Sequence, residues 1–110
     1  MIDEEEIDRL IADVGLEDFK MLLDVFLNEY SSKLESLSHN LDTTNHERLE
    51  LDSHTLKSLA RTFGAVELGD SCAKLELAAE HQEQASYREF FETIQTSGNS
   101  ATQALRDKYI

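Results

Sequence analysis

The sequence predicts an all-α protein: an antiparallel up-down-up-down four-helix bundle with a short N-terminal covering helix. The chain of 110 residues has the size of one domain, so we expect a single unit over residues 1–110. It contains no proline and only four glycines, whereas the helix formers Leu, Glu and Ala are abundant. Apolar residues recur at helical spacing in segments with short connections, and short connections make neighbouring helices antiparallel.

The first two expected helices differ in length. Apolar residues at i, i+3, i+4 and i+7 predict a short first helix between a capping box of Asp3 with Glu6 and a stop at Gly15. The second helix is expected from about Glu17 to Leu41. Its apolar stripe consists of Phe19, Leu22, Leu23, Phe26, Tyr30, Leu34, Leu37 and Leu41.

Three further helices complete the expected bundle. The third begins near Thr44, which forms a capping box with Glu47, and ends at Gly64, which can adopt the left-handed conformation. The apolar faces of the last two helices consist of Leu68, Cys72, Leu75 and Ala79, and of Tyr87, Phe90, Phe91, Ile94, Ala101, Leu105 and Tyr109. The last helix starts near Ser86. Its stretch "TSGNS" resembles a break, but the apolar phase continues beyond it, so we expect no full break and leave a local kink at Gly98 open.

Charge and composition exclude several classes of partner. The net charge of −13 makes the chain a poor ligand for nucleic acid and for anionic membranes, which carry the same sign. No apolar run is long enough to span a membrane, and the acidic N-terminus lacks the features of a signal peptide. A single cysteine rules out an internal disulfide and fits a reducing compartment. We therefore expect a cytoplasmic monomer.

Helical geometry predicts that His54 is exposed. At about 100° per residue, the apolar side chains of the third helix fall roughly 140° to 240° away from His54. These side chains are Leu49, Leu56, Leu59, Ala60 and Phe63. Polar residues fall within about 60° of His54 on the opposite side. They are Glu47, Glu50, Lys57, Ser58 and Arg61, and Leu51 lies at the edge of the same sector.

The neighbours of His54 favour phosphoryl chemistry over a surface histidine without a task. Lys57 and Arg61 add positive charge beside the imidazole of a strongly acidic protein, and the small Ser58 lets a partner approach the helix closely. A neutral imidazole is a good nucleophile near physiological pH, and its attack on phosphorus gives a phosphoramidate suited to onward transfer. A nearby ammonium offsets phosphate charge without coordinating it rigidly.

The remaining reactive residue types indicate no second site. No glutamate precedes any histidine by three residues, the spacing used by di-iron bundles, so we expect neither a metal nor a cofactor. His39, His46 and His81 are expected to be ordinary surface histidines, and Cys72 a buried, inert thiol. The chain has no glycine-rich phosphate loop, so we expect neither ATP binding nor kinase activity.

The stretch "SHTLKSLARTFGA" followed by "LGDSCAKLE" resembles the histidine-containing phosphotransfer (HPt) domain family. The matching positions are His54, Leu56, Lys57, Ser58, Gly64, Ala65, Leu68, Cys72, Leu75 and Glu76. The family commonly has glycine where this chain has Ser58, and serine keeps that position small. The resemblance implies one HPt domain over residues 1–110 that carries phosphate in a multistep His–Asp phosphorelay. His54 would be the phosphoacceptor, through the ring nitrogen farther from its backbone.

The same resemblance implies roles for neighbouring residues and for partners. Lys57 would help hold the phosphoryl group, Gly64 is a structural position of the motif, and Ser58, Arg61 and Leu51 would lie on the docking surface. The stretch "LLDVFLNEY" resembles more closely the single-domain members of the family that act in quorum sensing. This likeness implies two partners, the receiver domain of a hybrid sensor kinase and that of a response regulator. Mg²⁺ is expected on the receiver. The open alternative is a non-catalytic helical adaptor that docks a signalling partner through the His54 face.

Overall fold

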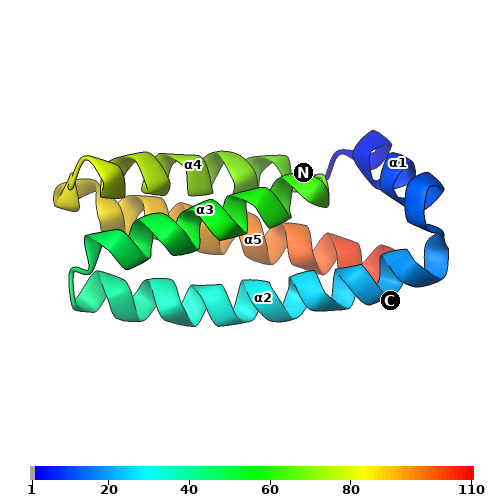
Figure 1. The fold of residues 1–110 in the computed structure, drawn as a ribbon, viewed down its shortest axis with the longest axis horizontal. Coiled ribbons are helices and arrows are strands. Elements are labelled where there is room, and N and C mark those ends of the chain that lie inside the picture. The colour runs from blue at the N-terminus through cyan, green and yellow to red at the C-terminus, as the bar shows by residue number, and fades with distance from the viewer. Residues whose placement is uncertain (1) are drawn as a thin grey trace.

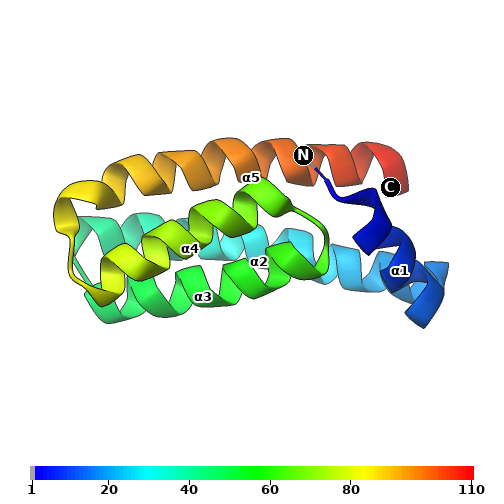
Figure 2. The ribbon, with the colours of Figure 1, turned by 90° about the horizontal axis from the view of Figure 1, so that it is seen from above.

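The computed structural model describes residues 2–110, which form five α-helices and one short 3₁₀ turn. The elements are α1 (Glu4–Val14), α2 (Leu16–Asp42), α3 (His46–Thr62), α4 (Val66–Glu80), η1 (Gln84–Ser86) and α5 (Tyr87–Tyr109). Helices α2 to α5 lie side by side along the 41 Å axis of the molecule, and α1 lies across one end (Figures 1 and 2). Contacts between α2 and α5 close the bundle, which confirms the expected fold class. Within residues 2–110, no helix combines the length and apolar character needed to cross a membrane.

The N-terminus of α1 is capped by Asp3, but the expected capping box is only half formed. The Asp3 carboxylate accepts hydrogen bonds from the backbone N–H groups of Glu5 and Glu6, at 3.1 and 3.4 Å. The Asp3 N–H, which a capping box would direct to Glu6, instead donates to the carbonyl of Gly64 at 2.7 Å. The Glu6 carboxylate pairs with Arg9. The cap thus fastens α1 to the turn between α3 and α4.

Gly64 ends α3 as expected and leaves no room for a side chain. Its φ of +66° is left-handed, a conformation that glycine adopts without a steric penalty. A Cβ atom at this position would lie 2.6 Å from the backbone oxygen of Asp3. Next to it, Ala65 forms an isolated antiparallel bridge with Ile2. This turn therefore positions the start of α4 and the N-terminal segment together.

The N-cap of α3 is Asn45, so the expected capping box of Thr44 and Glu47 is wrong. The Asn45 side chain accepts a hydrogen bond from the backbone N–H of Arg48 at 3.1 Å. Thr44 lies in the turn before the helix with a φ of +52°. That conformation is not the extended one of an N-cap residue, whereas Asn45 has it. The helix consequently starts at His46.

The core follows the expected apolar stripes, with one exception on α2. Leu23, Phe26 and Tyr30 are buried as expected, but Leu22 is 43% exposed and Leu27 is buried in its place. The reason lies in helix lengths: α2 has 27 residues and α3 only 17, so α2 runs past the end of α3. The side of α2 that carries Leu22 has no α3 beside it there.

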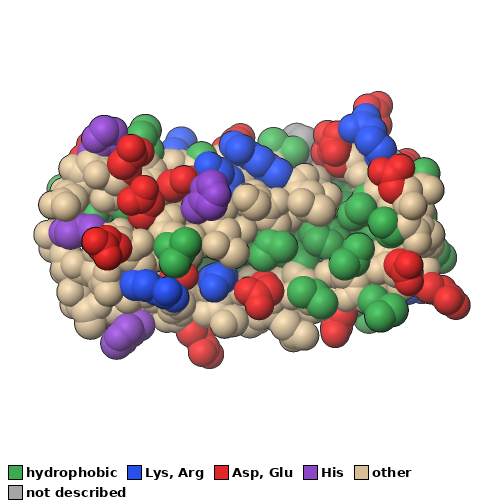
Figure 3. Space-filling model, viewed as in Figure 1, with side chains coloured by type: hydrophobic (Ala, Val, Ile, Leu, Met, Phe, Trp, Pro, Cys, Tyr) green, Lys and Arg blue, Asp and Glu red, His purple; other side chains and the backbone are tan. Residues whose placement is uncertain are grey.

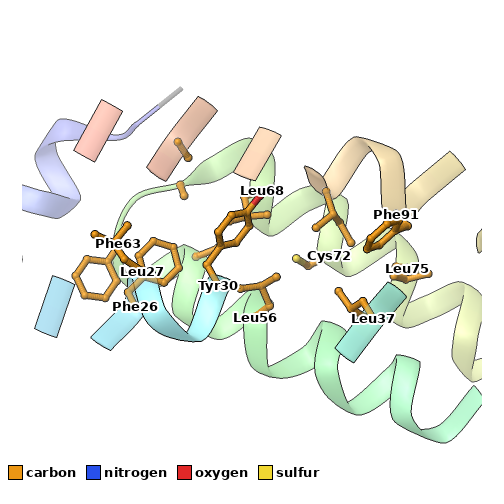
Figure 4. Packing of buried hydrophobic residues seen from close by; sticks show 14 of the residues in the cluster. Phe26, Leu27, Tyr30, Leu37, Leu56, Phe63, Leu68, Cys72, Leu75 and Phe91 are labelled. Carbon is orange, nitrogen blue, oxygen red and sulfur yellow. The ribbon is translucent and has the colours of Figure 1, made fainter. Parts of the chain in front are cut away.

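Cys72 lies within this core, as expected (Figure 4). Its side chain is fully buried among apolar residues of the bundle. Burial, reinforced by the negative charge of Glu76, raises the pKa of the thiol to about 12. The thiol therefore stays protonated at neutral pH and behaves as a small apolar side chain.

The last helix is continuous through Gly98, which confirms the absence of a full break. Gly98 is buried, and a Cβ atom there would collide with the ring and hydroxyl of Tyr30 from α2. The Tyr30 hydroxyl donates a hydrogen bond to the Asn99 side chain at 2.8 Å. Glycine is thus present because α2 and α5 approach each other closely at this point.

We predict that Gly98→Ala destabilises the protein, although alanine is the better helix former by about 1 kcal/mol. Tyr30 is 5% exposed and held by Asn99, so its ring cannot move aside without strain. Overpacking of this kind costs about 1–3 kcal/mol. Urea unfolding of Gly98→Ala, with exposed Ser100→Ala on the same helix as control, measures the effect. A more stable Gly98→Ala variant would contradict the packing argument.

Candidate functional site

His54 lies in the middle of α3 and points away from the core. Its side chain is 58% exposed, while Leu56, Ala60 and Phe63 on the opposite side of α3 are buried. The exposure predicted from helical geometry is therefore confirmed. Figure 3 views this face: basic side chains lie over α3 and the adjoining part of α2, and hydrophobic side chains gather over α2 toward the α1 end.

The imidazole of His54 is hydrogen-bonded to a glutamate from the neighbouring helix. Its Nδ1 atom lies 2.9 Å from Oε2 of Glu76 on α4. The other carboxylate oxygen, Oε1, is buried and lies 2.5 Å from the ammonium of Lys57. Antiparallel packing of α3 and α4 brings these three side chains together. They form one polar cluster, which we call the His54 cluster.

The electrostatics of the His54 cluster keep Glu76 ionised. Burial raises the pKa of this carboxyl, but the hydrogen bonds and charges of Lys57 and His54 together lower it by more. The resulting pKa is below the ordinary value of a glutamate. A carboxylate only accepts hydrogen bonds, so Nδ1 of His54 must carry the proton. In the neutral imidazole the lone pair then resides on Nε2. Nε2 has no hydrogen-bond partner within residues 2–110.

The other expected site residues occupy the surroundings of His54. Ser58 is exposed and Leu51 is 52% exposed, both on the His54 face of α3. Arg61 is also exposed, and its side-chain stem packs over Gly69 of α4, where a Cβ atom would lie 3.2 Å from Arg61 Cγ. Lys57 lies on the same side of α3 but is only 19% exposed, because its ammonium pairs with Glu76.

A shallow depression adjoins His54 on the side of α3 nearer its N-terminus. Its lining consists of Glu47, Glu50, Leu51, His54 and Glu76. The depression is open to solvent, as a surface that meets another protein would be, and it is unlike the enclosed apolar pocket of a small-molecule site.

One of the three remaining histidines is not an ordinary surface residue. His39 and His81 are exposed, as expected. His46 is partly buried, and its Nδ1 atom lies 2.7 Å from the hydroxyl of Tyr87 on α5. The expectation failed because this partner is 41 residues away in the chain. Within residues 2–110, no group of three or more His, Cys, Asp or Glu side chains is placed to hold a metal ion.

Sequence reasoning assigned no role to Glu76 and overlooked Asp52. Glu76 was one of the matching motif positions, but nothing in its local sequence indicates contact with a histidine 22 residues earlier. Asp52 adjoins Ser53 and His54 in the sequence, but side chains at adjacent helical positions diverge and cannot form a Ser–His–Asp triad. The structure buries Asp52 and Ser53, and the Ser53 hydroxyl donates a hydrogen bond to the carbonyl of Leu49.

This four-helix fold with an exposed, carboxylate-bound histidine defines a histidine phosphotransfer module. The family model of the Hpt domain matches residues 21–108, and the chain belongs to that family. Hpt proteins are phosphotransfer intermediates in phosphorelays and are not kinases.

Two known proteins are similar to this chain. The phosphorelay protein LuxU of Vibrio harveyi is 34% identical over 65 residues, which span 59% of this chain and 57% of LuxU. The crystal structure of histidine-containing phosphotransfer protein B (HptB) from Pseudomonas aeruginosa PAO1 matches with a TM-score of 0.94, covering 98% of this chain and 93% of that chain. At 21% identity, the match to HptB shows a shared fold.

We predict that replacing Glu76 with Gln destabilises the protein in a pH-dependent manner. Because the folded pKa of Glu76 is lowered, its contribution to stability is complete above the ordinary pKa of 4.5 and is lost as the pH falls through the folded pKa. The difference in unfolding free energy between wild type and Glu76→Gln should therefore narrow from about pH 7 to about pH 3. Urea unfolding across this range checks it, with exposed Glu80→Gln as control. A difference that stays constant would disprove the linkage.

Proposed function

We propose that this protein carries a phosphoryl group between the aspartates of two receiver domains, with His54 as the phosphoacceptor. The observation that supports this most directly is the hydrogen bond from Nδ1 of His54 to the ionised Glu76. It presents the lone pair of Nε2 at the exposed side of an Hpt domain. Within residues 2–110, the other polar groups of the site are Glu76 and Lys57, and no phosphate-binding loop accompanies them.

The transfer step follows from this arrangement. The Nε2 lone pair attacks the phosphorus of an aspartyl phosphate on the receiver, and an N–P bond forms as the P–O bond to the aspartate breaks. The aspartate leaves as a carboxylate with the electron pair of that bond. The imidazole ring becomes cationic, and its Nδ1 proton stays on the hydrogen bond to Glu76. The cationic ring is a good leaving group, so the same path in reverse passes the phosphoryl group to the next receiver.

Lys57 supports this step in two ways. Its ammonium offsets the charge of Glu76, at 2.5 Å, so that an incoming phosphoryl group does not meet an uncompensated carboxylate beside His54. The family resemblance implies that Lys57 also helps to hold the phosphoryl group. The position of Lys57, one turn after His54, keeps this charge close without blocking Nε2.

The receiver domain would dock on the exposed surface around His54. Ser58 leaves clearance, and Leu51 and Arg61 flank it. We include in this docking surface an apolar strip on α2, where Met21 is 69% and Val25 54% exposed. Adjacent exposed apolar side chains of this kind are typical of protein–protein contacts.

The partners we infer are the receiver domain of a hybrid sensor kinase and that of a response regulator. The likeness to LuxU supports a place in such a relay, including one of quorum sensing. Mg²⁺ would bind to the receiver, and this chain would need no cofactor of its own. The net charge of −13 supports a cytoplasmic monomer that binds neither nucleic acid nor membranes.

We predict that His54→Gln abolishes phosphate acceptance and leaves the fold intact. Exposed substitutions usually change stability by no more than about 0.5 kcal/mol. Incubation with a receiver domain charged by acetyl phosphate, followed by a search for acid-labile, base-stable phosphate, measures acceptance. His81→Gln, at another exposed position, is the matched control. Phosphate on the His54→Gln variant, or none on wild type, would refute the assignment, and the latter outcome would favour an adaptor without chemistry.

We predict that bulk at position 58 blocks transfer although serine itself is not needed. Ser58 lies one turn after His54 on the docking side of α3. Ser58→Gly should transfer at nearly the wild-type rate, with a loss of helix stability of up to about 1 kcal/mol. Ser58→Tyr should keep the fold and slow transfer from a charged receiver about a hundredfold, as expected for a misplacement of about 1 Å. Transfer at the full rate to folded Ser58→Tyr would place the docking surface elsewhere.

A further inference from the structure

Asp52 forms a polar cluster that the transfer step does not use. It lies two residues before His54, yet it is 1% exposed and faces the interface between α3 and α2. Its Oδ2 atom accepts hydrogen bonds from the hydroxyl of Ser36 and, at 3.4 Å, from the amide of Asn40, both on α2. A buried carboxylate is costly unless such partners surround it, so this residue is held firmly in place.

Two cations share the other oxygen of this buried carboxylate. Arg48 Nη2 lies 3.3 Å and Lys33 Nζ 3.8 Å from Oδ1 of Asp52. Their side chains are 49% and 21% exposed, so both remain partly accessible to solvent. Within residues 2–110, neither cation has another carboxylate at ion-pair distance. Two cations against one carboxylate give this cluster a charge of +1; the carboxylates of Glu47 and Glu50, in the depression beside His54, form no ion pair with either cation.

This basic pair lies within reach of any protein that docks on His54. Arg48 precedes His54 by six residues, about 9 Å along the helix axis, and the exposed Leu51 lies between them. A standard interface covers about 800 Å² on each partner, a disc of roughly 16 Å radius. Around α3, Leu51 lies about 60° and Arg48 about 120° from His54 on the side that faces α2. A receiver domain that docks on His54 and on this side of α3 would therefore also cover the cluster in which Asp52 holds Arg48 and Lys33.

We propose that Asp52 anchors Lys33 and Arg48 as a recognition point for a carboxylate side chain of the docking receiver domain. The proposal rests on the proposed function. If a receiver domain covers this positive charge and supplies no anion, one cation loses its water and gains no partner, which is unfavourable. A receiver with an acidic residue at this point is favoured, and one with an apolar or basic residue is rejected. Because Asp52 already orders both cations, little side-chain entropy is lost when the partner binds.

The test uses three variants: Arg48→Gln, Lys33→Gln and the two substitutions combined. The control is Arg106→Gln, which removes the same charge from an exposed position on α5, outside this face. The donors are a panel of receiver domains charged with acetyl phosphate in Mg²⁺. Phosphoramidate serves as a small donor that needs no docking surface. Initial rates give KM and kcat at about 50 and 300 mM salt, and thermal melting confirms that each variant is folded.

We expect each single variant to raise KM for the charged receiver about fivefold, the upper end for an exposed ion pair, with kcat unchanged. The salt dependence of KM should weaken, because one charge of the docking pair is gone. Phosphoramidate should modify all variants equally, and Arg106→Gln should match wild type. An unchanged KM and salt dependence in folded Arg48→Gln would overturn the proposal. Failure of wild type to accept phosphate from any donor would instead refute the proposed function.

Discussion

The carboxylate of Glu76 reaches from α4 to two side chains of α3, and the chemical state of His54 follows from that contact. Because Lys57 and His54 keep the carboxylate ionised, the imidazole must donate through Nδ1 and keep its lone pair on Nε2. The contact requires a fixed register between two antiparallel helices. That register depends on the turn that joins α3 to α4, where Gly64 has a left-handed backbone and its carbonyl accepts a hydrogen bond from Asp3.

Two carboxylates organise the basic side chains on this face, with different consequences. Glu76 lies near the surface and orients His54, the proposed phosphoacceptor, so its partners belong to the proposed transfer step. Asp52 is buried between α2 and α3 and holds Arg48 and Lys33 at the edge of the same surface. These two carboxylates thereby order three cations beside His54 on a protein whose net charge is −13.

Unequal helix lengths shape the rest of the proposed docking surface. Because α2 extends beyond α3, one side of α2 near the α1 end has no α3 beside it, although the core side there remains buried. Met21, Leu22 and Val25 are therefore exposed, on the helix that adjoins α3. The covering helix α1 closes the end of the core but leaves this strip open, so the same packing that completes the bundle supplies an apolar area for a partner.

The sequence alone determined the helices, the exposure of His54 and the end of α3 at Gly64, because these features depend on periodicity and backbone preference within one segment. It could not show that Glu76 binds His54 or that Asp52 is buried against α2. Those contacts depend on the register and relative lengths of packed helices, which spacing along one helix does not encode. Gly98 shows both kinds of information. The apolar spacing on either side of it predicts a continuous helix, but only the approach of Tyr30 from α2 explains why that position must be glycine.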